Sequence, residues 1–183
     1  MAVPKLDLQA VWNSGKTWKE WTAASQPAVR ETMERYYHET PISDDDAVFL
    51  GGIKRPVHIL ALSEDWCGDV QRNTPVLARV CAVGTQILLR IVDKETRPEL
   101  MVRYLTNAAE AIPIFVFMSD KFVEVGNWGP RPYECKRLMA RGKASGQMDV
   151  ARAGIHKFYE GDKHRSTVKE IRDLIAIAAA EAV

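Results

Sequence analysis

Two short and almost wholly apolar runs stand out in the middle of the chain. Val57–Leu62 reads as a strand that is buried on both faces, and 85–92 reads as a second strand. The segment between them, from about Cys67 to Cys81, has the pattern of a helix. A strand, a crossover helix and a second strand form a right-handed unit, so we expect the two strands to be parallel.

The pattern beyond the second strand predicts four further elements. They are a helix over 98–107, a hairpin of strands 114–118 and 122–125 around 119–121, and a helix from Pro132 to about Arg141. Residues 142–146 then read as a loop, and 167–180 as a final amphipathic helix with one apolar stripe. The order β-α-β-α-β-β-α between residues 57 and 141 predicts a small mixed sheet with helices on both faces.

The first fifty residues look helical. Thr17 and Glu20 have the spacing of a capping box, Pro27 suits the first turn of a second helix, and 43–46 could cap a short third one. We therefore divide the chain into an N-terminal helical extension (1–55), an α/β core (56–141) and a C-terminal helical extension (142–183) that packs on the same domain. Trp12, Trp18 and Trp21 are interpreted as the apolar face that packs on the sheet, or alternatively as a partner surface.

Composition and charge narrow the possible functions. The 183 residues are 46% hydrophobic, and 25 basic against 24 acidic residues leave a net charge of +1. This balance gives no electrostatic reason to expect nucleic acid or a membrane as a partner. Three widely spaced cysteines are no disulfide framework, and no secretory signal is visible, which favours a cytoplasmic protein with reduced thiols. The four histidines lack metal-ligand spacing, and we expect neither a metal nor a cofactor.

The chemical motif follows the first strand directly. Trp66-Cys67-Gly68 resembles the thioredoxin active-site motif, in which a tryptophan precedes a Cys-x-x-Cys pair. Pro75, Ile112-Pro113 and Gly126 also agree with positions usual in that family: a kinking proline in the helix, a cis-proline before the third strand and a glycine at the end of the fourth. The resemblance implies a thioredoxin-like three-layer α/β/α sandwich in which Pro113 faces a nucleophilic Cys67.

The expected position of Cys67, at the start of a helix and opposite a proline, has a physical reason. A helix N-terminus has free N–H groups and a partial positive charge, which favour a thiolate at Cys67. Proline has no N–H, so the backbone groups beside it can dock an extended peptide or thiol. Cys67 is thus the candidate catalytic residue. The candidate substrate-binding residues are Trp66, Gly68, Asp69, Ile112, Pro113, Trp128 and Arg131. Trp128 could instead cap the sheet, and Asp69 could cap the helix while opposing thiolate formation.

The motif also departs from the family pattern. Val70 replaces the second cysteine, so no disulfide can form across the motif, and Ala61 replaces the usual buried acid. Cys81 lies fourteen residues along the same helix, roughly 21 Å away, beyond the reach of a disulfide. Cys135, near the start of the helix at Pro132, is a possible resolving thiol or otherwise a packing residue.

Three functional hypotheses follow. The leading hypothesis is a thiol-dependent redox protein that acts as a monothiol oxidoreductase. Cys67 forms a mixed disulfide, and an external thiol resolves it. Its partners would be protein disulfides or thiols, or low-molecular-weight thiols. The alternative is a redox-inactive thioredoxin-like module that binds peptides or proteins. A third hypothesis is a monothiol glutaredoxin-like carrier of an iron–sulfur cluster. The substrate, the electron donor and the oligomeric state stay open.

Overall fold

The sheet at the centre of the molecule has four strands. In the computed structural model, which describes residues 6–180, they are β1 (Val57–Ser63), β2 (Ile87–Asp93), β3 (Ile114–Met118) and β4 (Glu124–Trp128). The spatial order is β2-β1-β3-β4. β1 and β2 are parallel, while β3 is antiparallel to both β1 and β4. The parallel pair and the hairpin expected from the sequence are therefore confirmed, although β4 runs on to Trp128 instead of ending at residue 125.

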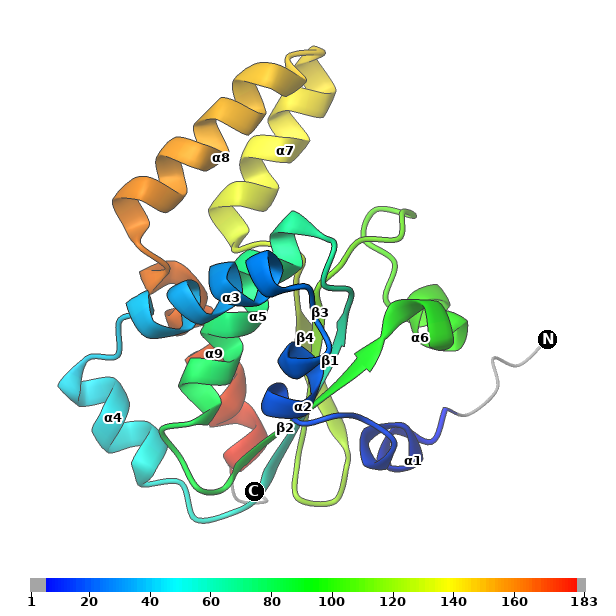
Figure 1. Ribbon diagram of the computed structural model, residues 1–183, viewed down its shortest axis with the longest axis vertical. Coiled ribbons are helices and arrows are strands. Elements are labelled where there is room, and N and C mark those ends of the chain that lie inside the picture. The colour runs from blue at the N-terminus through cyan, green and yellow to red at the C-terminus, as the bar shows by residue number, and fades with distance from the viewer. Residues whose placement is uncertain (1–5, 181–183) are drawn as a thin grey trace.

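Helices cover both faces of this sheet, as the sequence predicted. α5 (Gly68–Cys81) and α9 (Arg165–Ala179) lie on one face, with α3 (Pro27–Glu39) packed outside α5. Figure 1 shows α1 (Leu8–Asn13) and α6 (Pro98–Arg103) on the other side. The remaining elements are α2 (Trp18–Ala23), α4 (Asp44–Gly51) and the 3₁₀ turn η1 (Lys94–Thr96). The architecture is a three-layer α/β/α sandwich.

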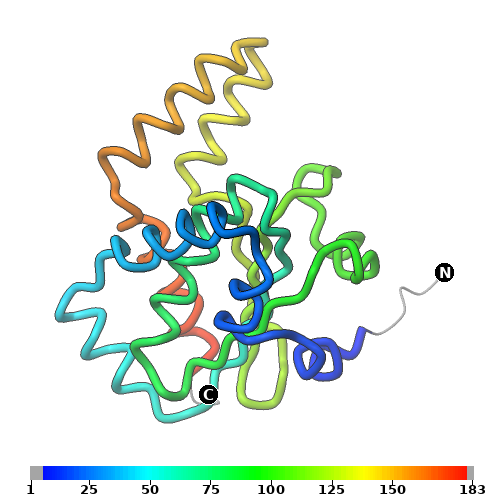
Figure 2. The backbone as a smooth tube through the Cα atoms, viewed as in Figure 1, coloured from blue at the N-terminus to red at the C-terminus, as the bar shows by residue number. Residues whose placement is uncertain are grey.

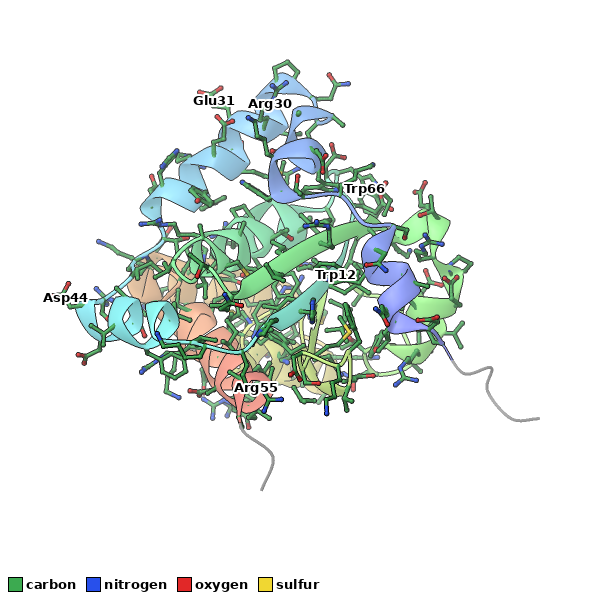
Figure 3. All side chains as sticks on the ribbon, turned by 90° about the horizontal axis from the view of Figure 1, so that it is seen from below. Trp12, Arg30, Glu31, Asp44, Arg55 and Trp66 are labelled. Carbon is green, nitrogen blue, oxygen red and sulfur yellow. The ribbon has the colours of Figure 1, made fainter. Side chains whose placement is uncertain are left out.

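The N-terminal helices begin where the sequence indicated. The Thr17 hydroxyl accepts from the Glu20 N–H, and the Glu20 carboxylate accepts from the Thr17 N–H, which completes the capping box at α2. The tryptophans of this region pack inward. Trp21 is buried and donates to Asp93 Oδ1 at 3.0 Å, and Trp12 donates to the Ile59 carbonyl at 3.2 Å. Figure 3 shows Trp12 between α1 and the sheet. Their role is to hold α1 and α2 to β1 and β2.

Residues 133–162 differ from the sequence-based expectation. The helix expected to end near residue 141 continues as α7 (Tyr133–Ser145), so the expected loop at 142–146 is wrong except at Gly146, whose φ is +71°. A further helix, α8 (Met148–Asp162), then runs back along α7, and the two project from the body as a hairpin (Figure 2). A Cβ at Gly142 would lie 2.4 Å from Ala151 Cβ. Gly142 therefore allows the two helices to approach closely, and it does not end a helix.

α9 is the helix that covers the sheet after β4. It packs on β4, β3 and α5, and its buried stripe of Val168, Ile171 and Ile175 agrees with the predicted amphipathic pattern. A Cβ at Gly126 would lie 2.9 Å from Leu174 Cδ2, so this glycine brings β4 against α9. The α7–α8 hairpin thus stands between the last strand and the last helix of the sandwich. Between residues 6 and 180, no helix is both long and apolar enough to span a membrane.

Candidate active site

Cys67 lies at the N-terminal end of α5, where the chain leaves β1. It is the N-cap residue, with φ −83° and ψ 123°, and its carbonyl accepts the first helical hydrogen bond, from Gln71. Its sulfur is partly exposed and lies 3.7 Å from the carbonyl oxygen of Ile112. The Ile112–Pro113 peptide bond is cis. The structure thus brings the nucleophile candidate and the proline together, although they are 46 residues apart in the sequence.

Two electrostatic effects act on this sulfur. No side chain caps the start of α5, so its first N–H groups and the helix dipole favour negative charge there. The contact with the Ile112 carbonyl has the opposite preference, because only the protonated thiol can donate to an oxygen. The helix terminus and the Ile112 carbonyl thus act on the sulfur in opposite directions.

Gly129 packs against the backbone of Pro113. Its φ is +133°, and a Cβ at this position would lie 2.0 Å from the carbonyl oxygen of Pro113. Both the backbone conformation and the close approach require a residue without a side chain. The turn that follows β4 therefore fixes the position of the Pro113 segment opposite Cys67.

A cavity of about 460 Å³ opens beside Cys67. One wall comes from the start of α5, the other from the α7–α8 hairpin. Its lining comprises Cys67, Gly68, Asp69, Arg72, Arg131, Met139, Arg152, Ile155, His156 and Tyr159. The size is that of a pocket for a small molecule.

Asp69 and Arg131 form the ion pair at the floor of this cavity. The guanidinium contacts both carboxylate oxygens, with Nε–Oδ1 at 2.8 Å and Nη2–Oδ2 at 2.5 Å. Burial raises the pKa of Asp69, and the charge of Arg131 acts in the opposite direction. Arg131 and Asp69 therefore offset each other's charge within the cavity lining.

Asn73 ties the hairpin to the site. It is fully buried, and its amide nitrogen donates to the carbonyls of Asp69 and Pro130 at 3.1 and 3.3 Å. It also lies 3.2 Å from the hydroxyl of Tyr159 on α8. One side chain therefore joins α5, the turn after β4 and the hairpin.

The other residues singled out from the sequence have different surroundings. Trp66 is 62% exposed beside Cys67 and is available for contact with a partner. Trp128 is buried, stacks on Phe115 and donates to Glu170 at 2.6 Å, so it caps the sheet, and it is not part of the lining of the cavity beside Cys67. Cys135 is fully buried against Tyr159, and burial raises the pKa of its thiol to about 11. Cys81 is also buried. Both thiols pack in the interior.

The sequence analysis missed the contribution of α8. Arg152, His156 and Tyr159 line the cavity, but the helix that carries them was not predicted. The available signal was the four-residue spacing of Ala151, Ile155 and Tyr159, which are the buried residues of this helix. Within residues 6–180, no three His, Cys, Asp or Glu side chains gather as metal ligands.

Comparisons with known proteins agree with this geometry. A family model described as thioredoxin matches residues 15–147. A crystal structure of a Pseudomonas aeruginosa protein of unknown function has a TM-score of 0.71 and 17% identity, and an HIV epitope-scaffold has a TM-score of 0.70 and 17% identity. Each alignment covers 93% of this chain and 98% of the other. No curated protein matches. With the matched model extending over most of the sandwich and the motif helix, the chain belongs to the thioredoxin family, within the thioredoxin-like superfamily.

Proposed function

We propose that the protein catalyses thiol–disulfide exchange through Cys67 alone. The observation that carries this proposal is the position of its sulfur: at an uncapped helix N-terminus, next to the Ile112–Pro113 segment, and open to a cavity. Such a position puts the positive end of the α5 dipole beside the sulfur and leaves room for a second sulfur. The three free cysteines suit a reducing compartment, which we propose is the cytoplasm.

The exchange has two steps. The Cys67 thiolate attacks a substrate disulfide, the substrate S–S bond breaks, and one substrate sulfur leaves as a thiolate that takes up a proton. Cys67 is then held in a mixed disulfide. A low-molecular-weight thiol attacks this bond, releases Cys67 as a thiolate and carries the oxidation away as a new disulfide. An external thiol is needed because Val70 occupies the position of a resolving cysteine and is fully buried.

Neighbouring groups would orient the substrate. The Pro113 segment offers backbone groups for an extended chain, and Trp66 supplies an exposed apolar surface beside the sulfur. The protein partners of this reaction would therefore dock along Pro113 and against the Trp66 indole.

Intact-protein mass spectrometry tests the proposal. The parent and Cys67→Ser would each be incubated with a small symmetric disulfide and then with an excess of its thiol. We expect one reversible adduct on the parent and none on Cys67→Ser. Equal modification of both proteins, or an adduct that the thiol cannot remove, would contradict single-cysteine exchange.

A second candidate is a redox-inactive module that binds peptides. The hydrogen bond from the Cys67 thiol to the Ile112 carbonyl favours it, because that contact stabilises the protonated sulfur. Under this alternative a peptide would bind the parent and Cys67→Ser with equal affinity, and no adduct would form on either protein.

A further inference from the structure

Arg72 is a cation in the cavity that forms no salt bridge with any residue between 6 and 180, although the Asp69 carboxylate lies close enough to interact with its charge. Its guanidinium lies over the rings of Tyr159 and Tyr36, at 4.5 and 5.1 Å from their centroids. No carboxylate among the described residues forms a direct ion pair with it. Stacking on two rings restrains the guanidinium plane while its edge N–H groups stay free to donate. The side chain is thus held in place without its hydrogen-bonding capacity being used.

The other charges of the cavity strengthen this positive character. Asp69 is the acidic residue of the lining, and Arg131 already occupies both of its oxygens. Arg152 and His156 face the cavity from α8. Arg152 pairs at 3.0 Å with Asp149, which is exposed and is not part of the lining. A ligand in the cavity therefore meets more positive than negative charge.

We propose that this cavity binds a carboxylate-bearing low-molecular-weight thiol, or its disulfide, with the carboxylate on Arg72 and the sulfur at Cys67. The inference rests on the proposed function and names the external thiol that this function requires. Arg72 lies five positions after Cys67 along the chain, which corresponds to an axial rise of about 7.5 Å on a helix, and both residues line the cavity. That separation and the volume of about 460 Å³ fit a small molecule that spans both groups.

The covalent step follows the scheme above with an anionic disulfide. The Cys67 thiolate attacks one of its sulfurs, the S–S bond breaks, and one carboxylate-bearing thiol leaves and takes up a proton. The other half stays bonded to Cys67 with its carboxylate at Arg72. A second molecule of the same thiol then attacks the mixed disulfide, restores the Cys67 thiolate and releases the symmetric disulfide.

The test compares two disulfides that differ in charge, bis(2-carboxyethyl) disulfide and bis(2-hydroxyethyl) disulfide. We expect the parent to form the Cys67 adduct about ten-fold faster with the anionic reagent, as suits a hydrogen-bonded charge pair. Arg72→Met should lose this preference, so that the variant forms the adduct at similar rates with the anionic and the neutral reagent. Arg72→Lys should keep part of it. Arg141→Met, which removes an exposed cation from outside the cavity lining, is the matched control and should behave like the parent.

The outcomes separate the inference from the proposed function. An unchanged preference in Arg72→Met, with normal adduct formation, would overturn the anion site and leave the exchange activity standing. If neither the parent nor any variant forms an adduct, the proposed exchange activity is refuted. The anion site is then tested by ligand binding alone. Cys67→Ser should bind bis(2-carboxyethyl) disulfide by calorimetry, with the Kd raised about ten-fold when Arg72→Met is added. Equal affinity in both, or no binding, would overturn the inference.

Discussion

Replacing Gly129 with alanine should dislodge the Pro113 segment. The added Cβ would lie 2.0 Å from the Pro113 carbonyl oxygen, so one backbone segment must move by about 1.4 Å to restore ordinary van der Waals contact. Overpacking of this kind costs about 1–3 kcal/mol, and a side chain at φ +133° adds about 1–3 kcal/mol of backbone strain. The free energy of unfolding should fall by roughly 2–6 kcal/mol.

Urea unfolding measures this loss, and Gly68→Ala provides the matched control. A Cβ at Gly68 meets no atom within 4 Å, and this glycine begins α5. Alanine there should leave stability unchanged or raise it by about 0.5–1 kcal/mol. At a typical urea m-value of about 2 kcal/mol/M, Gly129→Ala should lower the midpoint by about 1–3 M. A midpoint within about 0.2 M of the parent would refute the close packing of Gly129 on Pro113.

Three further outcomes can be measured on the same protein. Burial lowers the pKa of His164 from 6.5 to about 4, so the stability that its neutral form contributes is complete above pH 6.5 and is lost as the pH falls through 4. This loss in the free energy of unfolding should reach about 3 kcal/mol, measured by urea unfolding at a series of pH values. It should vanish in His164→Asn, because asparagine tolerates the φ of +65° at this position. An equal loss in both proteins would contradict the assignment to His164. Asn73→Ala should cost about 2–5 kcal/mol, because it leaves two buried oxygens without a donor, and an unchanged urea midpoint would argue against the bridge. Alkylation should add one label to the native protein, at Cys67, and three after unfolding, since Cys81 and Cys135 are buried; native labelling of either buried thiol would show that the interior opens.

The sheet and the position of the motif helix could be predicted because their signals are local. The seven residues of β1 are all buried, and this strand leads directly into the segment that carries Cys67. The relation of Cys67 to Pro113 came from the family resemblance and agrees with the observed contact. No property of the residues around Pro113 alone would have placed it opposite the sulfur.

The cavity wall that the α7–α8 hairpin forms could not be predicted from local sequence signals. A glycine such as Gly142 is typical of a helix end. Only the close approach of Ala151 shows why a glycine is needed here inside a helix. Tyr159 and Arg72 come together across 87 residues, so their stacking depends on how the hairpin docks. The apolar spacing of α8 and the start of α7 were both visible in the sequence, but no local signal indicated that the two helices pack along each other.

The residue proposed to react and the residues that form the opposite wall of the cavity come from different segments of the chain, because the α7–α8 hairpin supplies that wall. Cys67, the proposed nucleophile, and Pro113 lie at the ends of α5 and of the sheet. α8 supplies much of the opposite wall and has a small interior of its own around Cys135, Ile155 and Tyr159. The hairpin contacts α5 through Tyr159, but it adds no strand to the sheet, so its outer part can vary in length and side chains without changing the sheet. Under the proposed function, changes in the hairpin would alter which small molecules fit the cavity while the exchange proposed for Cys67 stays the same.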